Sequence, residues 1–229
     1  MQLFFADELT PEHAVLGKDE SHHASRVLRL ETGAEVLVTQ GRGIIYKAHI
    51  RELSKTKSLL AVSKVYSEEK RDRYLHIAIG PTKSLDRFEF FLEKATELGI
   101  DEITPLISFH SERKVYKTDR GKKVIQAAVK QSMSNWLPVL NEPLPFNQLL
   151  GKPGSNRFIA HCNTERERMP LLPKIAQLKE SLVLIGPEGD FSPDEIETAV
   201  QAGFTEVSLG EKRLRTETAG LAVALAASL

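Results

Sequence analysis

Two segments of the sequence combine glycine with charged side chains in a way that suits a ligand site. The first, residues 186–192, reads GPEGDFS and joins an apolar run to a segment with strong helix-start signals. Its two glycines allow a ligand to approach the backbone closely. Helix starts often bind phosphate, but four carboxylates crowd this one: Glu188, Asp190, Asp194 and Glu195. The segment favours an uncharged or cationic ligand, unless it is only a tight turn.

The common nucleotide motifs are missing from the sequence. It has no P-loop pattern, and no GxGxxG follows a predicted strand, which disfavours nucleoside triphosphates and NAD. S-adenosylmethionine carries ribose hydroxyls and a sulfonium cation but no phosphate. It therefore suits residues 186–192 better than a nucleotide does.

The second segment, residues 209–219, reads LGEKRLRTETA and is the most charged loop near the carboxyl end. It lies between a strand-like run and an apolar helical run. Arg215 and Glu217 are candidate site residues. Alternatively, Arg213, Arg215 and Glu217 form ion pairs while Thr216 or its neighbours cap the helix. Taken alone, this loop decides nothing.

The loops need a scaffold, and the sequence predicts two domains, at 1–69 and 72–229. Residues 1 to about 66 read as strands and turns with one helix-like run at 20–30, which is typical of a small β-barrel. Residues 67–72 carry five charges and no apolar side chain, as in an exposed linker.

Strands and helices alternate in the second domain. We predict strands at 74–80, 102–107, 157–162, 182–186 and 205–209, and helices at 84–98, 119–133, 193–202 and 216–228. Such alternation predicts an α/β domain with a parallel sheet covered on both faces. Ligands bind beyond the carboxyl ends of such strands, where the two loops lie. Ser192, Pro193 and Glu195 predict a capped helix start.

The last predicted helix is apolar almost all round, so every side should be covered. Interior packing would achieve this, and so would a dimer interface. The uncharged run 218–229 is far shorter than the roughly 20 apolar residues of a membrane span, so we expect none. The amino terminus has no secretory signal and Cys162 is the only cysteine, which suggests a cytoplasmic protein.

Composition limits how the chain could bind RNA. With 31 Lys and Arg against 31 Asp and Glu among 229 residues, it has no net attraction for a polyanion, so an RNA surface must be local. The best candidate is the basic stretch 113–130, unless it is only a solvated helix face. His22 and His23 have no Cys or His cluster around them, so we predict no metal site.

Together, the two loops resemble the paired carboxy-terminal motifs of the RsmE family of SPOUT methyltransferases, roughly GPEGG-F-S and LG-x-R-x-LR-x-ETA. Other landmarks extend the resemblance over nearly the whole chain: His22-His23 before RVLR at 26–29, Lys83 with Asp86-Arg87, KATELG at 94–99, Glu112-Arg113 and Gln131-Ser132. Asp190 departs from the family, which usually has a second glycine there, and an arginine commonly found after Gln131-Ser132 is missing. Asp tolerates the left-handed backbone better than most residues.

The resemblance implies a fold and an activity. The fold is a SPOUT-type parallel sheet with a C-terminal trefoil knot, preceded by a small PUA-like β-barrel that binds RNA. The activity is S-adenosylmethionine-dependent methylation of uridine N3 in 16S (small-subunit) rRNA, free or in the assembled small ribosomal subunit, by a homodimer. A non-enzymatic ribosome-assembly factor and a SPOUT enzyme acting on another RNA are the alternatives.

The resemblance also implies site residues. The cofactor-binding positions are His161, Gly186, Glu188, Gly189, Leu209, Gly210, Leu214 and Thr218. Candidate RNA-binding residues are His22, His23, Arg26, Arg29, Arg87, Arg113, Lys114 and Lys117. We assign catalysis to Arg215, which would stabilise negative charge on the base, with Glu217 orienting Arg215 or accepting the proton. Cys162 and Trp136 are expected in the core.

Overall fold

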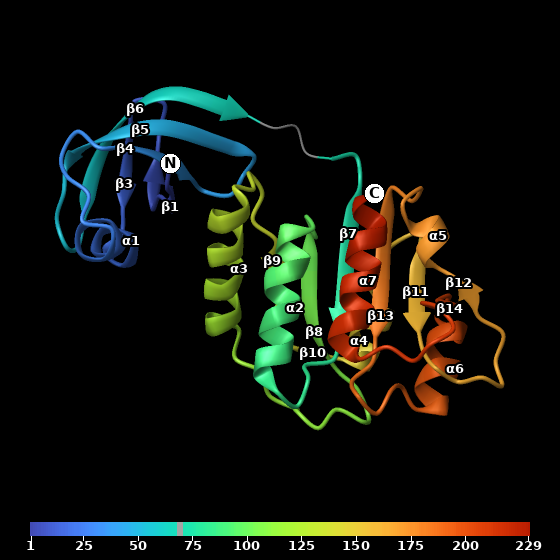
Figure 1. Ribbon diagram of the computed structural model, residues 1–229. Helices are drawn as coiled ribbons and strands as arrows, with labels where there is room; N and C mark the ends of the chain where they lie inside the picture. Colours follow the sequence, from blue (N-terminus) through green and yellow to red (C-terminus); the bar gives the residue numbers. More distant parts are fainter. Residues whose placement is uncertain (68–70) are drawn as a thin grey trace. The chain divides into compact units, whose positions relative to one another are not determined.

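The computed structural model describes residues 1–67 and 71–229 and divides the chain into two compact units. Unit 1 comprises residues 1–70 and 126–137, and unit 2 comprises residues 71–125 and 138–229. Figure 1 shows the order of the helices and strands along the chain. Half of the predicted linker, residues 68–70, lies outside the described residues.

Unit 1 contains a curled six-stranded sheet. In spatial order its strands are β1 (Leu3–Phe5), β4 (Glu35–Thr39), β5 (Ile44–Glu52), β6 (Ser58–Ser67), β3 (His13–Leu16) and β2 (Glu8–Leu9). β1 and β4 pair in parallel, and the other strand pairs described in this sheet are antiparallel. Alternate residues such as Val36, Val38, Ala48 and Ile50 are buried in one core, as the period of two in a strand requires.

The helical segment of unit 1 changes pitch part-way. The α-helix α1 (Lys18–His22) continues as the π-helix η1 (His23–Val27), and the Leu28 N–H donates to the His23 carbonyl at 3.0 Å. Arg29 has a φ of 52°, which ends the helical geometry. The predicted helix at 20–30 is therefore present but ends earlier than expected.

Trp136 packs on a glycine turn of unit 1. Gly43 has a φ of 86°, and a Cβ there would lie 2.4 Å from the Trp136 ring. The turn thus needs glycine both for its backbone conformation and for the space the indole occupies. Trp136 is half-buried, so the expected core position is only partly realised.

The sheet of unit 2 is parallel throughout, which confirms the prediction. Its order is β10 (Leu144–Pro145), β8 (Glu102–Ile107), β7 (Tyr74–Ile79), β13 (Glu180–Ile185), β11 (Arg157–Ala160), β14 (Thr205–Ser208) and β12 (Met169–Pro170), and β9 (Val139–Leu140) also pairs with β8. The two-residue strands β9, β10 and β12 were not predicted, because they are too short to show periodicity. The trefoil knot stays a prediction.

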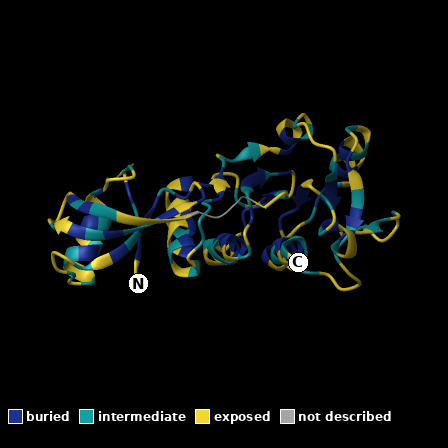
Figure 2. Cartoon of the chain, turned by 90° about the horizontal axis from the view of Figure 1, so that it is seen from above, coloured by how far each residue is buried: buried dark blue, intermediate teal, exposed yellow. Residues whose placement is uncertain are grey.

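Helices cover both faces of this sheet. The first face carries α2 (Leu85–Glu97), α5 (Leu172–Ile175) and α7 (Thr216–Ser228), and α2 and α7 approach so closely that a Cβ on Gly220 would lie 2.5 Å from the Phe91 ring. The second face packs α4 (Phe146–Leu150) and α6 (Pro193–Gln201) on Leu182 and Leu184 of β13. Helix α3 spans Thr118–Ser132. Figure 2 shows the central strands coloured as buried.

Two predicted helices agree with the structure, α7 at both ends and α6 at its start. Helix α7 spans the predicted residues, and α6 begins at Pro193 with the predicted capping box between Ser192 and Glu195. Along α7, Val223 and Ala224 are buried, but Leu225 is 50% exposed beside a groove shared with α2. Packing within unit 2 therefore leaves one side of this apolar helix open.

Across residues 1–67 and 71–229, no helix is both long and apolar enough to cross a membrane. The same residues contain no cluster of three or more His, Cys, Asp or Glu side chains that could hold a metal ion.

Candidate functional site

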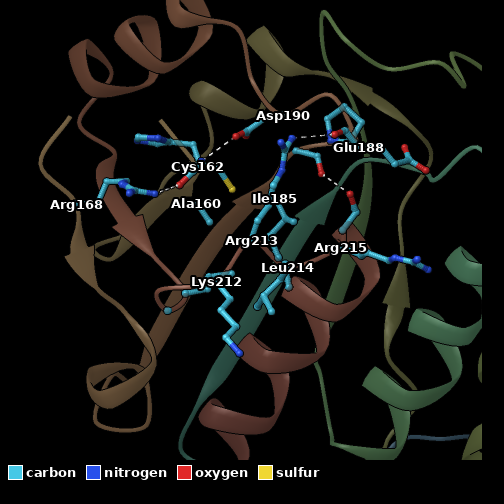
Figure 3. A pocket seen from close by; sticks show the side chains of 17 residues that line it. Ala160, Cys162, Arg168, Ile185, Glu188, Asp190, Lys212, Arg213, Leu214 and Arg215 are labelled. Carbon is cyan, nitrogen blue, oxygen red and sulfur yellow. Dashed lines mark hydrogen bonds between the residues drawn. The ribbon is translucent and has the colours of Figure 1, made fainter. Parts of the chain in front are cut away.

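A cavity of about 290 Å³ opens at the carboxyl ends of β11, β13 and β14. Three loops surround it, one after each strand, and Figure 3 shows the side chains that line it. Its apolar wall consists of Ala160, Ile185, Leu209, Leu214 and Ala219. Parallel strands bring their carboxyl ends to one edge, so loops distant in sequence meet here, as predicted for an open α/β sheet.

The loop after β13 is a tight turn that presents its backbone to the cavity. The Asp190 N–H donates to the Pro187 carbonyl at 2.9 Å, and Asp190 has a φ of 63°. A Cβ on Gly186 would lie 3.1 Å from the Asp190 carbonyl carbon, so this turn leaves little room for a side chain. The left-handed backbone expected at Asp190 is present.

The Asp190 carboxylate joins two of the loops. Its Oδ2 accepts a hydrogen bond of 2.8 Å from the Cys162 N–H, and its Oδ1 accepts one of 2.8 Å from the Phe191 N–H. A charged carboxylate accepts both hydrogen bonds, so they are stronger than hydrogen bonds between neutral groups. The loop after β11 is thereby fixed against the loop after β13 (Figure 3).

The loop after β14 is tied to the same turn. The Thr216 hydroxyl donates to the Gly186 carbonyl at 3.1 Å, and Arg213 Nη2 donates to the Glu188 carbonyl at 3.4 Å. Gly210 has a φ of 133° and adopts a backbone conformation that favours glycine. Because Arg215 is the N-cap residue of α7, the positive end of this helix dipole also lies at the cavity.

His161, the first residue after β11, holds the following loop against Glu206 of β14. Its Nε2 lies 3.0 Å from Glu206 Oε1, and Arg166 Nη2 donates to Glu206 Oε2 at 3.0 Å. Burial lowers the pKa of His161 although Glu206 opposes the shift. The hydrogen bond from Arg166 lowers the pKa of Glu206. His161 is therefore neutral and Glu206 charged at neutral pH, a stable pair that holds the loop.

Cys162 corrects one prediction, because it is exposed and lines the cavity rather than filling the core. The strand β11 ends at Ala160, two residues earlier than predicted, so Cys162 lies in the loop. Desolvation raises the pKa of its thiol, with Asp190 adding to the shift. The side chain therefore stays a thiol at neutral pH and lacks the thiolate that nucleophilic catalysis requires.

Charges of both signs meet at the cavity. Glu188 and Asp190 lie on one side, while Arg168, Lys212, Arg213 and Arg215 contribute cations. Arg168 Nη1 donates to the His161 carbonyl at 2.6 Å. Lys212 and Arg215 are exposed and have no ion-pair partner among the described residues. An apolar wall, backbone polar groups and two free cations suit a flat organic ligand with a second, anionic reactant beside it.

The family of RNA methyltransferase domains matches residues 68–228, and the family of PUA domains of RNA methyltransferases matches residues 16–62. The chain belongs to the RNA methyltransferases. The first match covers unit 2 up to residue 228 and also includes residues 126–137, which belong to unit 1. The resemblance seen in the sequence and its implication of an enzyme are thus confirmed.

Relatives of this methyltransferase are similar over most of their length. Ribosomal RNA small subunit methyltransferase E of Synechocystis is 33% identical over 86% of this chain and 67% of the relative. A crystal structure from Porphyromonas gingivalis, described as a probable rRNA methyltransferase, is 38% identical with a TM-score of 0.85 and covers 98% of this chain and 95% of its own. The Neisseria gonorrhoeae methyltransferase E bound to S-adenosylmethionine is 25% identical with a TM-score of 0.82, covering 98% and 95%.

Most of the cofactor positions implied by the resemblance surround the cavity of this methyltransferase. They are His161, Gly186, Glu188, Leu209, Gly210 and Leu214, together with the catalytic candidate Arg215. Two further positions lie elsewhere. Gly189 packs against His110, where a Cβ would lie 2.8 Å from the His110 Cβ, and Thr218 lies on the open groove between α2 and α7.

Glu217 does not pair with Arg215 as the sequence suggested. The Glu217 side chain is buried, and its Oε1 lies 4.0 Å from Arg87 Nε of α2. Its position in the first turn of α7 directs the carboxylate to the neighbouring helix, whereas Arg215, just before the helix, stays at the cavity. Glu217 therefore does not orient Arg215.

The predicted RNA-binding residues are mostly exposed. In unit 1 these are His22, Arg26 and Arg29, whereas the His23 ring packs edge-on against Phe4 with centroids 6.0 Å apart. In unit 2, Lys114 and Lys117 are exposed, and Arg113 donates to the Lys83 carbonyl at 2.8 Å. Ion pairs partly neutralise the basic stretch, among them Arg120–Glu89, Lys122–Glu142 and Lys130–Glu20.

Several residues around the cavity were not predicted from the sequence. Arg168 and Lys212 line it, and His110 Nδ1 lies 3.1 Å from the Asp190 carbonyl. Arg168 and His110 reach the site from loops without a distinctive motif. Lys212 lies inside the second predicted loop, but the family resemblance implied no role for it, unlike its neighbours Gly210 and Leu214.

Proposed function

We propose that this chain transfers the methyl group of S-adenosylmethionine to N3 of a uridine in the 16S rRNA of the small ribosomal subunit. The observation that carries the proposal is the three-loop cavity at the carboxyl ends of β11, β13 and β14. The Neisseria gonorrhoeae relative, similar over nearly the whole chain, is bound to S-adenosylmethionine. Membership in the RNA methyltransferases supports RNA as the acceptor.

The residues at the cavity suit this cofactor. Ala160, Leu209 and Leu214 offer an apolar wall for a nucleobase, and the turn at 186–190 exposes backbone groups for ribose hydroxyls. Glu188 and Asp190 place negative charge beside the four cations of the cavity, which suits a ligand that carries charges of both signs, as S-adenosylmethionine does. When bound, S-adenosylmethionine would supply the electrophilic methyl group.

The acceptor atom determines what else the enzyme must do. Uridine N3 lies on the base-pairing edge, so the base must be unpaired and turned out of any helix. N3 also carries a proton, which passes to water before the methyl group is accepted, and negative charge then spreads onto the flanking carbonyl oxygens. Arg215 is an exposed cation at the cavity rim, and we assign it the role of stabilising that charge. Glu217 acts as a positioning residue for Arg87, because its Oε1 lies 4.0 Å from Arg87 Nε.

The rest of the molecule would serve RNA binding and assembly. In this proposal the domain at 1–69 binds RNA through the exposed His22, Arg26 and Arg29, and the domain at 72–229 carries the reaction. The open side of α7 pairs with a second copy to form a homodimer. Because the acceptor is part of the small ribosomal subunit, the enzyme works in the cytoplasm.

A genetic experiment tests the proposal. Small-subunit rRNA from a strain lacking this protein is digested to nucleosides and analysed by mass spectrometry beside rRNA from the parent strain. We expect 3-methyluridine to be lost and to return when the gene is restored, but not when the Arg215→Ala gene is supplied. An unchanged amount of 3-methyluridine in the deletion strain would refute the proposal.

A further inference from the structure

An aromatic side chain stands free beside the cofactor turn. Phe109, in the loop after β8, is 74% exposed, although large apolar side chains normally avoid water. Its ring meets the His110 ring edge-on with centroids 5.0 Å apart. The ring is not a loose appendage, because the Phe109 N–H donates to Glu195 Oε1 at 2.8 Å and so fixes its backbone to the start of α6.

The same loop is coupled to the cavity. His110 Nδ1 lies 3.1 Å from the Asp190 carbonyl, and the His110 Cβ fills the space beside Gly189. Asp190 lines the cavity with its side chain and contacts this loop with its backbone. Phe109 therefore stands one residue away from a direct contact with the turn that we assign to the cofactor.

Polar and acidic side chains lie beside Phe109, whereas exposed lysines follow it in the same loop. Beside the ring lies a cavity of about 480 Å³ that includes the polar side chains of Ser108, Asn147 and Asp194. A carboxylate in such a place repels phosphate but accepts an N–H from a base edge. Farther along the loop, Lys114 and Lys117 are exposed and have no ion-pair partner among the described residues. These cations suit the phosphates of the same strand.

We propose that Phe109 is a stacking platform for an unpaired base of the RNA substrate, next to the target uridine, with Lys114 and Lys117 holding the backbone of that strand. The inference rests on the proposed function, because RNA is taken as the partner. An exposed aromatic ring followed by cations in the same loop suits single-stranded nucleic acid, which is bound by base stacking and by positive charge along the backbone. A target uridine that must leave its helix also leaves a neighbour unstacked, and the ring replaces the lost stacking partner.

Binding of a labelled uridine oligonucleotide, single-stranded or paired with an adenosine strand, tests the platform. Phe109→Ala and Phe109→Leu should weaken single-strand binding by roughly 5- to 150-fold, the range for one base stacked on an aromatic ring. Phe109→Tyr should bind like the wild type. Val115→Ala is the matched control, because Val115 is 73% exposed in the same loop but has no ring. None of these changes should alter binding of the duplex.

A spectroscopic measurement reports stacking directly. The indole of Phe109→Trp should be quenched by the single strand, with the wild type, whose only Trp is Trp136, as the baseline. Equal binding by Phe109→Ala and wild type, or an unquenched indole, would overturn the inference. So would a change of sedimentation in Phe109→Ala, which would make the ring a contact between protein copies.

The proposed function can fail separately. If the wild-type protein binds single strands through Phe109 but methylates no small subunit, the stacking platform is supported and the proposed activity is refuted. A wild type that methylates small subunits normally, with Phe109→Ala matching it in both kcat and KM, would retain the activity and refute the platform.

Discussion

The carboxylate of Asp190 accepts a hydrogen bond of 2.8 Å from the backbone N–H of Cys162, and this bond closes the proposed cofactor site between two loops that are 28 positions apart in sequence. Relatives with glycine at the position of Asp190 would keep the left-handed turn but lack this bond. Here one side chain both tolerates the turn and fixes the neighbouring loop. The Asp190 carboxylate therefore stabilises the site in addition to the pairing of β11 with β13.

Replacing Asp190 should show what the carboxylate contributes. Asp190→Gly keeps the backbone conformation and removes both hydrogen bonds, so unfolding free energy should fall by about 1 to 3 kcal/mol. Asp190→Asn retains one acceptor oxygen and should lie between glycine and wild type. Urea denaturation measures all three proteins. A glycine variant as stable as the wild type would show that the bond to Cys162 contributes nothing.

Arg215 should matter for turnover and little for cofactor binding. Removing a donor aimed at developing charge typically lowers turnover about 100- to 1,000-fold, and Arg215→Ala should fall in that range. Single-turnover methyl transfer and calorimetric titration with S-adenosylmethionine separate the two effects. Lys212→Ala, which removes the neighbouring exposed cation, is the control and should change KM more than kcat. Near-normal turnover of Arg215→Ala would remove this residue from the mechanism.

A buried histidine near the amino end of the central strand β7 should make stability depend on pH. His76 Nε2 lies 2.7 Å from the Thr104 hydroxyl and 3.6 Å from Glu102 Oε1, and Lys152 also faces this cluster. Burial lowers the pKa of His76 to about 4, against the influence of Glu102. The folded protein thus binds the proton more weakly than the unfolded chain, and stability falls as pH drops from about 6.5 toward 4.

Denaturation at pH 7 and pH 5 tests this linkage. The wild type should lose roughly 2 kcal/mol more than His76→Gln over this interval, because only the wild type has an imidazole that the unfolded chain protonates. The variant also controls for the other acidic groups, which titrate in both proteins. If both proteins lost the same unfolding free energy, His76 would bind its proton as strongly in the folded protein as in the unfolded chain, which would contradict the lowered pKa.

The open side of α7 predicts self-association. Leu225 is 50% exposed next to a groove formed with Leu98 and Leu221, so Leu225→Glu should leave the fold intact and weaken a dimer. Leu229→Glu, at an 88% exposed position, is the control and should sediment like the wild type. A monomeric wild type at micromolar concentration would contradict the homodimer.

Local patterns predicted the main scaffold of unit 2 well. The β8 strand, the capping box of α6 and the limits of α7 follow from periodicity and from side chains that act on neighbouring residues. The strand order and the packing of α2 on α7 depend on contacts between distant residues, which periodicity does not encode. The return of residues 126–137 to unit 1 is of the same kind.

The site was predictable where a motif carried it and not elsewhere. Gly186 and Gly210 were recognised from the loops around them, and both line the cavity. Glu217 was misplaced because its direction depends on the helix turn and on α2, which sequence proximity to Arg215 obscures. Phe109 carries no motif, and its exposure is visible only in the fold.

The most direct test of the proposed function is methyl transfer by the purified protein in vitro. Small ribosomal subunits from a strain lacking the protein are incubated with isotope-labelled S-adenosylmethionine, and their rRNA is digested to nucleosides for mass spectrometry. We predict that the label enters 3-methyluridine in an amount stoichiometric with the subunits. Subunits that stay unlabelled, or a label on ribose 2'-oxygen or on another base, would contradict methylation of uridine N3 by this protein.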